Sequence, residues 1–326
     1  AALEGHAECV RLLCGAGAWV DLARNNGATP LLRAASKGHA ECVRLLCGAG
    51  ASVDLADSEG ATPLLMAASR GHAECVRLLC GAGASADLDS GRSGGVTPLL
   101  IAASRGHAES VQALCDAGAS VDLADHNGFT PLRMAASKGH ADCVQVLCGA
   151  GASVDRARSD GKTPLLAAAH HGHAECVQVL SSYGAARVSD AMQTNAEAVV
   201  PERNHVQVLA WLQSSRAWTA LHHVEVLTAA RARELLRGGA DLHAGSPSPL
   251  ERARAVEGEA SAIIHRAAVW SPEAHDLFPP AARARAVRLL QLGYLLAWSG
   301  HDMLRRRDRL SMRGSASSCR MPSCEA

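Results

Sequence analysis

The sequence predicts an all-α repeat fold, a solenoid of stacked helix-turn-helix units with projecting β-hairpin loops. Two recurring motifs predict it, because a fixed period of this length is the signature of a tandem repeat array. A Gly-His pair recurs in steps of 33 residues, with one step of 35, at Gly5, Gly38, Gly71, Gly106, Gly139 and Gly172. Thr-Pro-Leu recurs in the same frame, starting at Thr29, Thr62, Thr97, Thr130 and Thr163. The low aromatic content, 3%, fits a chain that packs small residues closely.

Each unit reads as two short helices and a polar loop. In the second complete unit, Thr62 can cap a helix whose first turn tolerates Pro63, and Gly71 ends it. A second helix begins near His72 and carries a broad apolar face of Cys75, Val76, Leu78, Leu79 and Cys80. The segment SVDLADSEG is short, polar and ends in glycine, as a projecting loop should. Neither helix is long enough to be stable alone, so the units must stack.

The succession of Thr-Pro-Leu, Ala-Ala, Gly-His-Ala-Glu, a short apolar helix, Gly-Ala and a polar hairpin resembles the ankyrin repeat. The resemblance covers residues 1 to about 186. It implies that hairpin tips and first-helix surfaces line a continuous concave groove. One departure is consistent: the His that usually follows Thr-Pro-Leu is Leu32, Leu65, Leu100, Arg133 and Leu166 here, and only His222 restores it. We therefore expect weaker hydrogen bonding from hairpin to helix in the main array.

The repeat pattern divides the chain into four predicted parts. Residues 1–186 hold regular repeats, of which the first is truncated. Residues 187–270 hold degenerate repeats, including Trp218 to Ala244, and such worn units are typical of the ends of a stack. Residues 271–304 form a C-terminal capping helix region, since Val287, Leu290, Tyr294 and Trp298 recur at helical spacing. Residues 305–326, rich in Arg and Ser, form a disordered tail.

Composition argues against several classes of partner. The formal net charge is zero and basic residues are scattered among acids, so we expect neither nucleic-acid nor membrane binding. The longest apolar stretches fall short of the roughly 20 residues that cross a bilayer. Ten of the 12 cysteines recur at fixed repeat positions, which fits reduced thiols buried as small hydrophobes. We expect a monomer in a reducing compartment, the cytoplasm or alternatively the nucleus.

No recognisable catalytic, metal or cofactor motif occurs. Cysteine pairs such as Cys42 and Cys47 lie five positions apart, which places the sulfurs at different azimuths of a helix. The histidines of the Gly-His motif are interpreted as partners for neighbouring backbone groups, and His170, His171 and His173 cluster without a Cys or acid at a metal-binding spacing. The recurring GAGAS follows a helix, so it is not a phosphate loop. We predict no enzyme activity, no cofactor and no metal.

The candidate site comes from positions that differ between nearly identical repeats. After the hairpin glycine stand Ala28, Ala61, Val96, Phe129 and Lys162, and one first-helix position holds Arg33, Met66, Ile101, Met134 and Ala167. On the implied groove, Met66, Ile101, Phe129 and Met134 would form an apolar centre flanked by Arg33 and Arg133, and we expect Phe129 and Met134 to be largely exposed. Lys162 follows in the last regular unit, and Arg92 lies in a third hairpin that is two residues longer than the others.

A basic stripe runs beside this surface, because Lys37, Arg70, Arg105 and Lys138 occupy one position near the end of each first helix. Each is followed four residues later by an acid, as Lys37 is by Glu41 and Arg70 by Glu74. We therefore expect local compensation of this charge and interpret the stripe as a solvated face.

The function predicted from these observations is a non-catalytic protein-protein interaction module, a scaffold or adaptor that binds a partner along the groove and hairpin tips. One alternative is a substrate-receptor subunit of a ubiquitin ligase, with the C-terminal helix recruiting the ligase, although residues 277–290 lack the Cys expected of a ligase-binding box. Another alternative is a linking arm of a larger multidomain protein. The partner's identity is not encoded in the fold.

Overall fold

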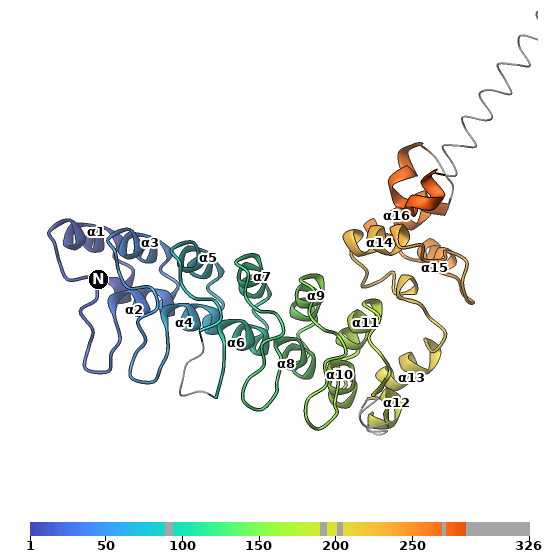
Figure 1. The fold of residues 1–326 in the computed structure, drawn as a ribbon, viewed down its shortest axis with the longest axis horizontal. Coiled ribbons are helices and arrows are strands. Elements are labelled where there is room, and N and C mark those ends of the chain that lie inside the picture. Colours follow the sequence, from blue (N-terminus) through green and yellow to red (C-terminus); the bar gives the residue numbers. More distant parts are fainter. Residues whose placement is uncertain (89–93, 190–193, 201–204, 269–271, 285–326) are drawn as a thin grey trace, which may run out of the picture.

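The structure is a computed structural model that describes residues 1–88, 94–189, 194–200, 205–268 and 272–284. Within these ranges it consists of helix pairs stacked along one direction, with loops that project beyond one row of helices (Figure 1). The predicted all-α repeat fold is confirmed. Arg92, most of the predicted capping helix region and the predicted tail lie outside the described residues.

The first helix of each complete repeat begins at the proline of Thr-Pro-Leu and ends at the residue before the glycine of Gly-His. Thr62 has extended backbone geometry, and its Oγ1 accepts a hydrogen bond from the Leu65 amide at 3.1 Å. Gly71 closes the helix in the left-handed region, with φ of 77°. The five first helices are α2 (Pro30–Lys37), α4 (Pro63–Arg70), α6 (Pro98–Arg105), α8 (Pro131–Lys138) and α10 (Pro164–His171).

The second helices begin one residue after the histidine and form a parallel row. Figure 1 shows this row above the first helices, with the loops extending below them. Its members are α1 (Ala7–Gly15), which follows a short 3-10 turn η1 (Ala2–Glu4), then α3 (Ala40–Gly48), α5 (Ala73–Gly81), α7 (Ala108–Asp116), α9 (Ala141–Gly149) and α11 (Ala174–Ser182).

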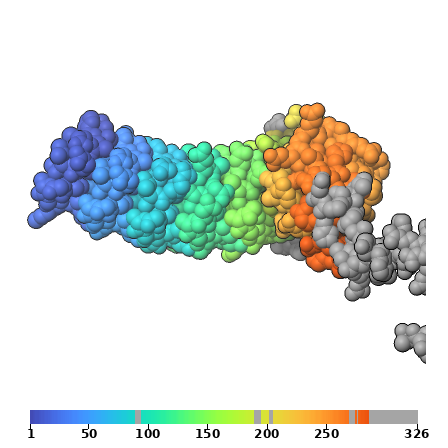
Figure 2. Space-filling view, turned by 90° about the horizontal axis from the view of Figure 1, so that it is seen from above, coloured from blue at the N-terminus to red at the C-terminus, as the bar shows by residue number. Residues whose placement is uncertain are grey.

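The core lies between the two rows and between successive repeats. First helix packs on first helix and second helix on second helix, so that one apolar cluster runs from Val10 to Leu212. The space-filling view shows successive repeats in contact along the rod (Figure 2). Leu64 and Leu79 are fully buried, whereas Leu78 is only partly buried. Leu79, and not Leu78, is therefore the deepest leucine of its helix.

The Gly-His pairs join neighbouring repeats. Nε2 of His39 lies 3.0 Å from the Leu3 carbonyl oxygen, and Nε2 of His107 lies 3.2 Å from that of Ser69 in the preceding repeat. The interpretation of these rings as partners for backbone groups is confirmed. Each ring also covers the preceding repeat's glycine, because a Cβ on Gly71 would lie 2.6 Å from Nδ1 of His107.

The loops between repeats are closed by isolated backbone bonds. The amide of Asp57 donates to the Ala61 carbonyl at 3.0 Å, and no strand is assigned in the described parts of the loops up to residue 187. Adjacent loops are also connected, since Asp54 Oδ1 accepts a hydrogen bond from the Ser85 amide at 3.0 Å. At the position that holds histidine in the family, Leu32, Leu65, Leu100 and Leu166 are buried. At these positions the leucine side chains cannot form hydrogen bonds to the loops.

Beyond α11 the helices are shorter and less regular. Two-residue antiparallel strands β1 (Val188–Ser189) and β2 (Thr194–Asn195) precede α12 (Ala196–Val199) and α13 (Val206–Ser214). A second apolar cluster is built from the elements that follow: η2 (Ala220–His222), α14 (Ala229–Arg237), α15 (Pro249–Ala255), α16 (Glu259–Ala268) and η3 (Pro272–Leu277). His222 restores the family's cap, since its Nδ1 accepts a hydrogen bond from the Thr219 amide at 2.9 Å.

Candidate functional site

The predicted site residues lie along the first helices and their loops. Because α2, α4, α6, α8 and α10 pack side by side, the equivalent positions Arg33, Met66, Ile101, Met134 and Ala167 follow one another along the stack. Phe129 and Lys162 precede α8 and α10 in the adjoining loops. The structure brings Phe129, Arg133, Met134 and Lys162 together in one cleft of about 450 Å³. Arg33, Met66 and Ile101 do not line it.

The Phe129 ring lines this cleft, and two guanidinium groups lie against it. The Cζ atom of Arg133 lies 4.7 Å from the ring centroid, and that of Arg158, from the next loop, lies 4.5 Å away. A guanidinium over an aromatic face is attracted by the negative charge of the ring's π face. The backbone of Phe129 is fixed as well, because its amide donates to Asp125 Oδ1 at 2.8 Å. The ring is partly buried, whereas we expected it to be largely exposed.

Arg133 connects this ring to the next repeat. It replaces the leucine of the other units, and its Nε donates to the Lys162 carbonyl at 3.3 Å. Its Nη2 lies 3.6 Å from Asp160 Oδ2, which also lies 3.4 Å from Arg158 Nη1. Arg133 is only 5% exposed, and burial lowers the pKa of its guanidinium, which the Asp160 charge opposes. Arg133 therefore supports Phe129. The expectation that it presents a free charge at the rim of the groove is wrong.

The remaining lining gives the cleft an apolar floor and a polar wall. Met134 and Ala167 belong to neighbouring first helices, and Met134 is partly buried where we expected it largely exposed. Several lining residues were not among the predicted site residues, and most come from the next loop or from helix ends: Asp125, Ser137, Lys138, Arg158, Asp160, His170 and His171. The sequence offered a signal for Lys138, which belongs to the basic stripe.

The basic stripe is not compensated as we expected. Glu41 pairs with Arg44, and Glu74 pairs with Arg77 at 3.0 Å, both within their own second helices. The expected pairing of these acids with Lys37 and Arg70 is wrong, because an arginine three residues along the same helix turn reaches them first. Among the described residues no carboxylate forms an ion pair with any of the stripe's four cations.

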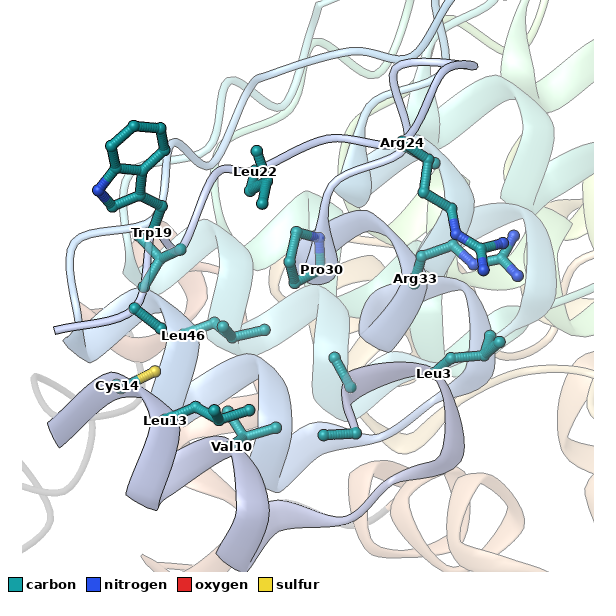
Figure 3. A pocket seen from close by; sticks show the side chains of 15 residues that line it. Leu3, Val10, Leu13, Cys14, Trp19, Leu22, Arg24, Pro30, Arg33 and Leu46 are labelled. Carbon is teal, nitrogen blue, oxygen red and sulfur yellow. The ribbon is translucent and has the colours of Figure 1, made fainter. Parts of the chain in front are cut away.

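A second hollow, of about 320 Å³, lies at the amino-terminal end of the stack (Figure 3). Val10, Leu13 and Leu46 line it, together with Trp19, which is 81% exposed. Leu13 is 53% exposed, whereas the equivalent Leu79 is fully buried by the neighbouring repeat. Arg33 lines this hollow and not the Phe129 cleft, which separates two residues that we expected to flank one groove. The hollow is the stacking face of a repeat.

A third crevice, of about 1080 Å³, separates α7 and α9 from α14 and was not anticipated. Across it the Cζ atom of Arg231 lies 5.0 Å from the Tyr183 ring centroid, and Arg231 Nη1 donates to Glu234 Oε2 at 2.7 Å. The crevice wall is mixed, with polar residues such as Asp116 and Glu234 beside apolar ones such as Val146 and Val154.

Most of the cysteines that the structure describes are buried or partly buried, and no metal site is found with them. Burial raises the pKa of the Cys143, Cys148 and Cys176 thiols to about 12, which keeps them protonated. Cys9 is exposed and departs from the expectation of buried thiols. In the part of the chain that the structure describes, no three His, Cys, Asp or Glu side chains are grouped as metal ligands. Among those same residues, no helix has the length and apolarity to span a bilayer.

This architecture, in which paired helices stack through a 33-residue period and loops project to one side, defines a repeat protein of the ankyrin class. A family model described as three copies of the ankyrin repeat matches residues 1–90, 85–158 and 120–193. The crystal structure of the human ASB11 ankyrin repeat domain is similar, with a TM-score of 0.56 and 31% sequence identity over 64% of this chain and 94% of that one. No curated protein matches the chain significantly. The chain belongs to the ankyrin-repeat family, whose repeats are generally protein-protein interaction modules.

Proposed function

We propose that this protein is a non-catalytic scaffold or adaptor that binds a partner protein over its first helices and loop tips, with the Phe129 cleft as the anchoring point. The observation that carries this proposal is the position of the Phe129 ring, which is partly exposed in a cleft and contacted by two guanidiniums. A ring held in place loses little conformational freedom on binding, and a few such anchors supply most of the affinity of an interface.

The composition of the cleft supports the same proposal. Met134 adds a flexible and polarisable side chain, and the charged groups of Lys138, Lys162 and Asp160 surround the apolar floor. An apolar centre with a polar rim is the usual anatomy of a protein-binding surface. We place the recognition surface in the regular repeats of residues 1–186, and we propose that residues 187–270 continue the stack as degenerate repeats. A monomer in the cytoplasm remains our expectation.

The test is affinity capture from a cell extract with the full chain and with Met134→Asp, which places a charge on the floor of the cleft. The control is Arg44→Ala, whose side chain is exposed on the second-helix row. Proteins retained by the wild type and by the control but lost with Met134→Asp are the expected result. Circular dichroism verifies that each variant is folded. Equal retention by all three proteins would remove the cleft from the proposal.

Two further variants measure how far the surface extends. Met66→Asp and Ile101→Asp place the same charge at the equivalent positions of α4 and α6. If retention is lost with Met134→Asp, partly lost with Ile101→Asp and kept with Met66→Asp, the partner lies mainly on the later repeats. The ubiquitin-ligase and linking-arm alternatives stay predictions, since the segment that would recruit a ligase lies mostly outside the described residues.

A further inference from the structure

The charges around the Phe129 cleft are unequal. Its lining carries four cationic side chains, Arg133, Lys138, Arg158 and Lys162, against two carboxylates, those of Asp125 and Asp160. Both carboxylates are occupied within the protein. Asp160 Oδ2 lies within 3.6 Å of Arg133 and 3.4 Å of Arg158, and Asp125 Oδ1 accepts hydrogen bonds from the Asn127 and Phe129 amides. The excess charge at the cleft is therefore positive.

That excess belongs to two lysines. Lys138 is exposed at the end of α8 and Lys162 is partly exposed in the next loop, and neither forms an ion pair with a described residue. Arg133 and Arg158 are engaged with Phe129, Asp160 and loop carbonyls, so they are not available to a partner. The free ammonium groups thus lie beside the apolar floor formed by Phe129 and Met134.

We propose that the partner contributes an extended acidic peptide segment with one apolar side chain, and this inference rests on the proposed function. The apolar side chain packs against Phe129 and Met134, while flanking carboxylates pair with Lys138 and Lys162. A nucleic acid is a poorer fit, because its phosphates would gain nothing from the apolar floor formed by Phe129 and Met134. Charge complementarity of this kind increases the association rate and selects against basic partners.

The chain contains its own matched control for this proposal. Lys37 occupies in α2 the position that Lys138 occupies in α8, and both are followed by Gly-His-Ala and preceded by Ala-Ala-Ser. Lys37 has no equivalent of the Phe129 ring beside it, since Ala28 stands at that position and is buried. Lys37→Glu therefore reproduces the local structural cost of Lys138→Glu without touching the cleft.

The experiment is selection of a displayed library of random dodecapeptides on the immobilised full chain, followed by fluorescence anisotropy with the consensus peptide. We expect enriched sequences to combine Asp and Glu with a single Leu, Ile, Met or Phe. Lys138→Glu with Lys162→Glu should weaken the consensus peptide at least about tenfold and flatten the dependence of affinity on salt concentration. Lys37→Glu should change the affinity less than about twofold.

Two other results would overturn the proposal. Enrichment of basic or neutral sequences, or no enrichment, would overturn the proposal for an acidic segment. Unchanged affinity after replacing the apolar residue of the consensus peptide with Gly would show attraction by charge alone and would also overturn it. If the extract capture still depends on Met134 in those cases, the cleft remains a protein-binding site and only the partner's chemistry is wrong. If neither experiment depends on the cleft, both proposals fail.

Discussion

The Cζ atom of Arg158 lies 4.5 Å from the centroid of the Phe129 ring, which belongs to the preceding loop. This contact joins one repeat to the next. A hydrogen bond between the same two loops accompanies it, since Arg158 Nε donates to the Asn127 carbonyl at 2.9 Å. The Cζ atom of Arg133 lies 4.7 Å from the same centroid. The cleft is thus shaped by contacts between neighbouring loops and by Arg133 of α8.

Replacing Phe129 with Leu should destabilise the protein by about 1 kcal/mol, because leucine keeps apolar contacts but cannot attract two guanidiniums. Phe129→Tyr retains the ring face and should stay close to the wild type. The free energy of unfolding is measured in urea by circular dichroism at 222 nm. Equal stability of the Leu and Tyr variants would mean that the ring's electrons contribute nothing to holding the loops.

Gly106 is required for two separate reasons. Its φ is 80°, a conformation that alanine adopts only with strain, and a Cβ there would lie 2.6 Å from Nδ1 of His140. Gly118 has a φ of 83° but open space around it. Gly106→Ala should therefore cost at least about 1 kcal/mol more than Gly118→Ala, which measures the backbone strain alone. Equal losses in urea unfolding would show that the ring moves aside freely.

Much of the fold could be predicted from the sequence because its determinants are local. Thr62 caps α4 through an amide three residues away, and Gly71 ends that helix through its own φ. The cleft could not be predicted in the same way. Phe129 and Arg158 stand 29 positions apart in neighbouring loops, and nothing in the sequence indicates that their side chains meet.

The predicted pairing of the basic stripe with acids four residues later was wrong for a different reason. Acids at the start of the second helices stand four residues after the stripe's cations, and this spacing predicts a pair on a continuous helix. A glycine in the left-handed region separates the two residues, so they lie on different helices. Arg77, three residues after Glu74 on the same helix, takes the carboxylate at 3.0 Å.

Leu79→Asp should unfold the array cooperatively, whereas Leu78→Asp should leave it folded with reduced stability. Leu79 is fully buried, so an aspartate there would be charged and unpaired between stacked repeats. Leu78 is partly exposed, which lets an aspartate at that position reach water. Thermal unfolding followed by circular dichroism separates the two cases. A Leu78→Asp protein as disrupted as Leu79→Asp would contradict this order of burial.

Acid should weaken the irregular C-terminal part of the chain through His223. This ring is 3% exposed and lies 5.4 Å from Trp211 and 5.5 Å from Trp218 between centroids. Burial, with the charges of Arg187, His222 and Arg252 added, lowers the pKa of His223 from 6.5 to about 3. The unfolded chain therefore binds a proton below pH 6.5 that the folded protein does not.

The stabilising effect of a neutral His223 is complete above pH 6.5 and is lost progressively as the pH falls from there towards 3. At pH 5 one such histidine costs about 2 kcal/mol. Urea unfolding followed by tryptophan fluorescence at pH 7.5, 6 and 5 measures the loss. The comparison is His223→Gln, whose side chain does not titrate. The free energy of unfolding of this variant should fall less steeply as the pH is lowered. His72, His173 and His222 contribute to the dependence on pH that remains, because burial lowers their pKa values as well. Identical slopes would mean that His223 is protonated in the folded state, which its burial against two tryptophans and two arginines opposes.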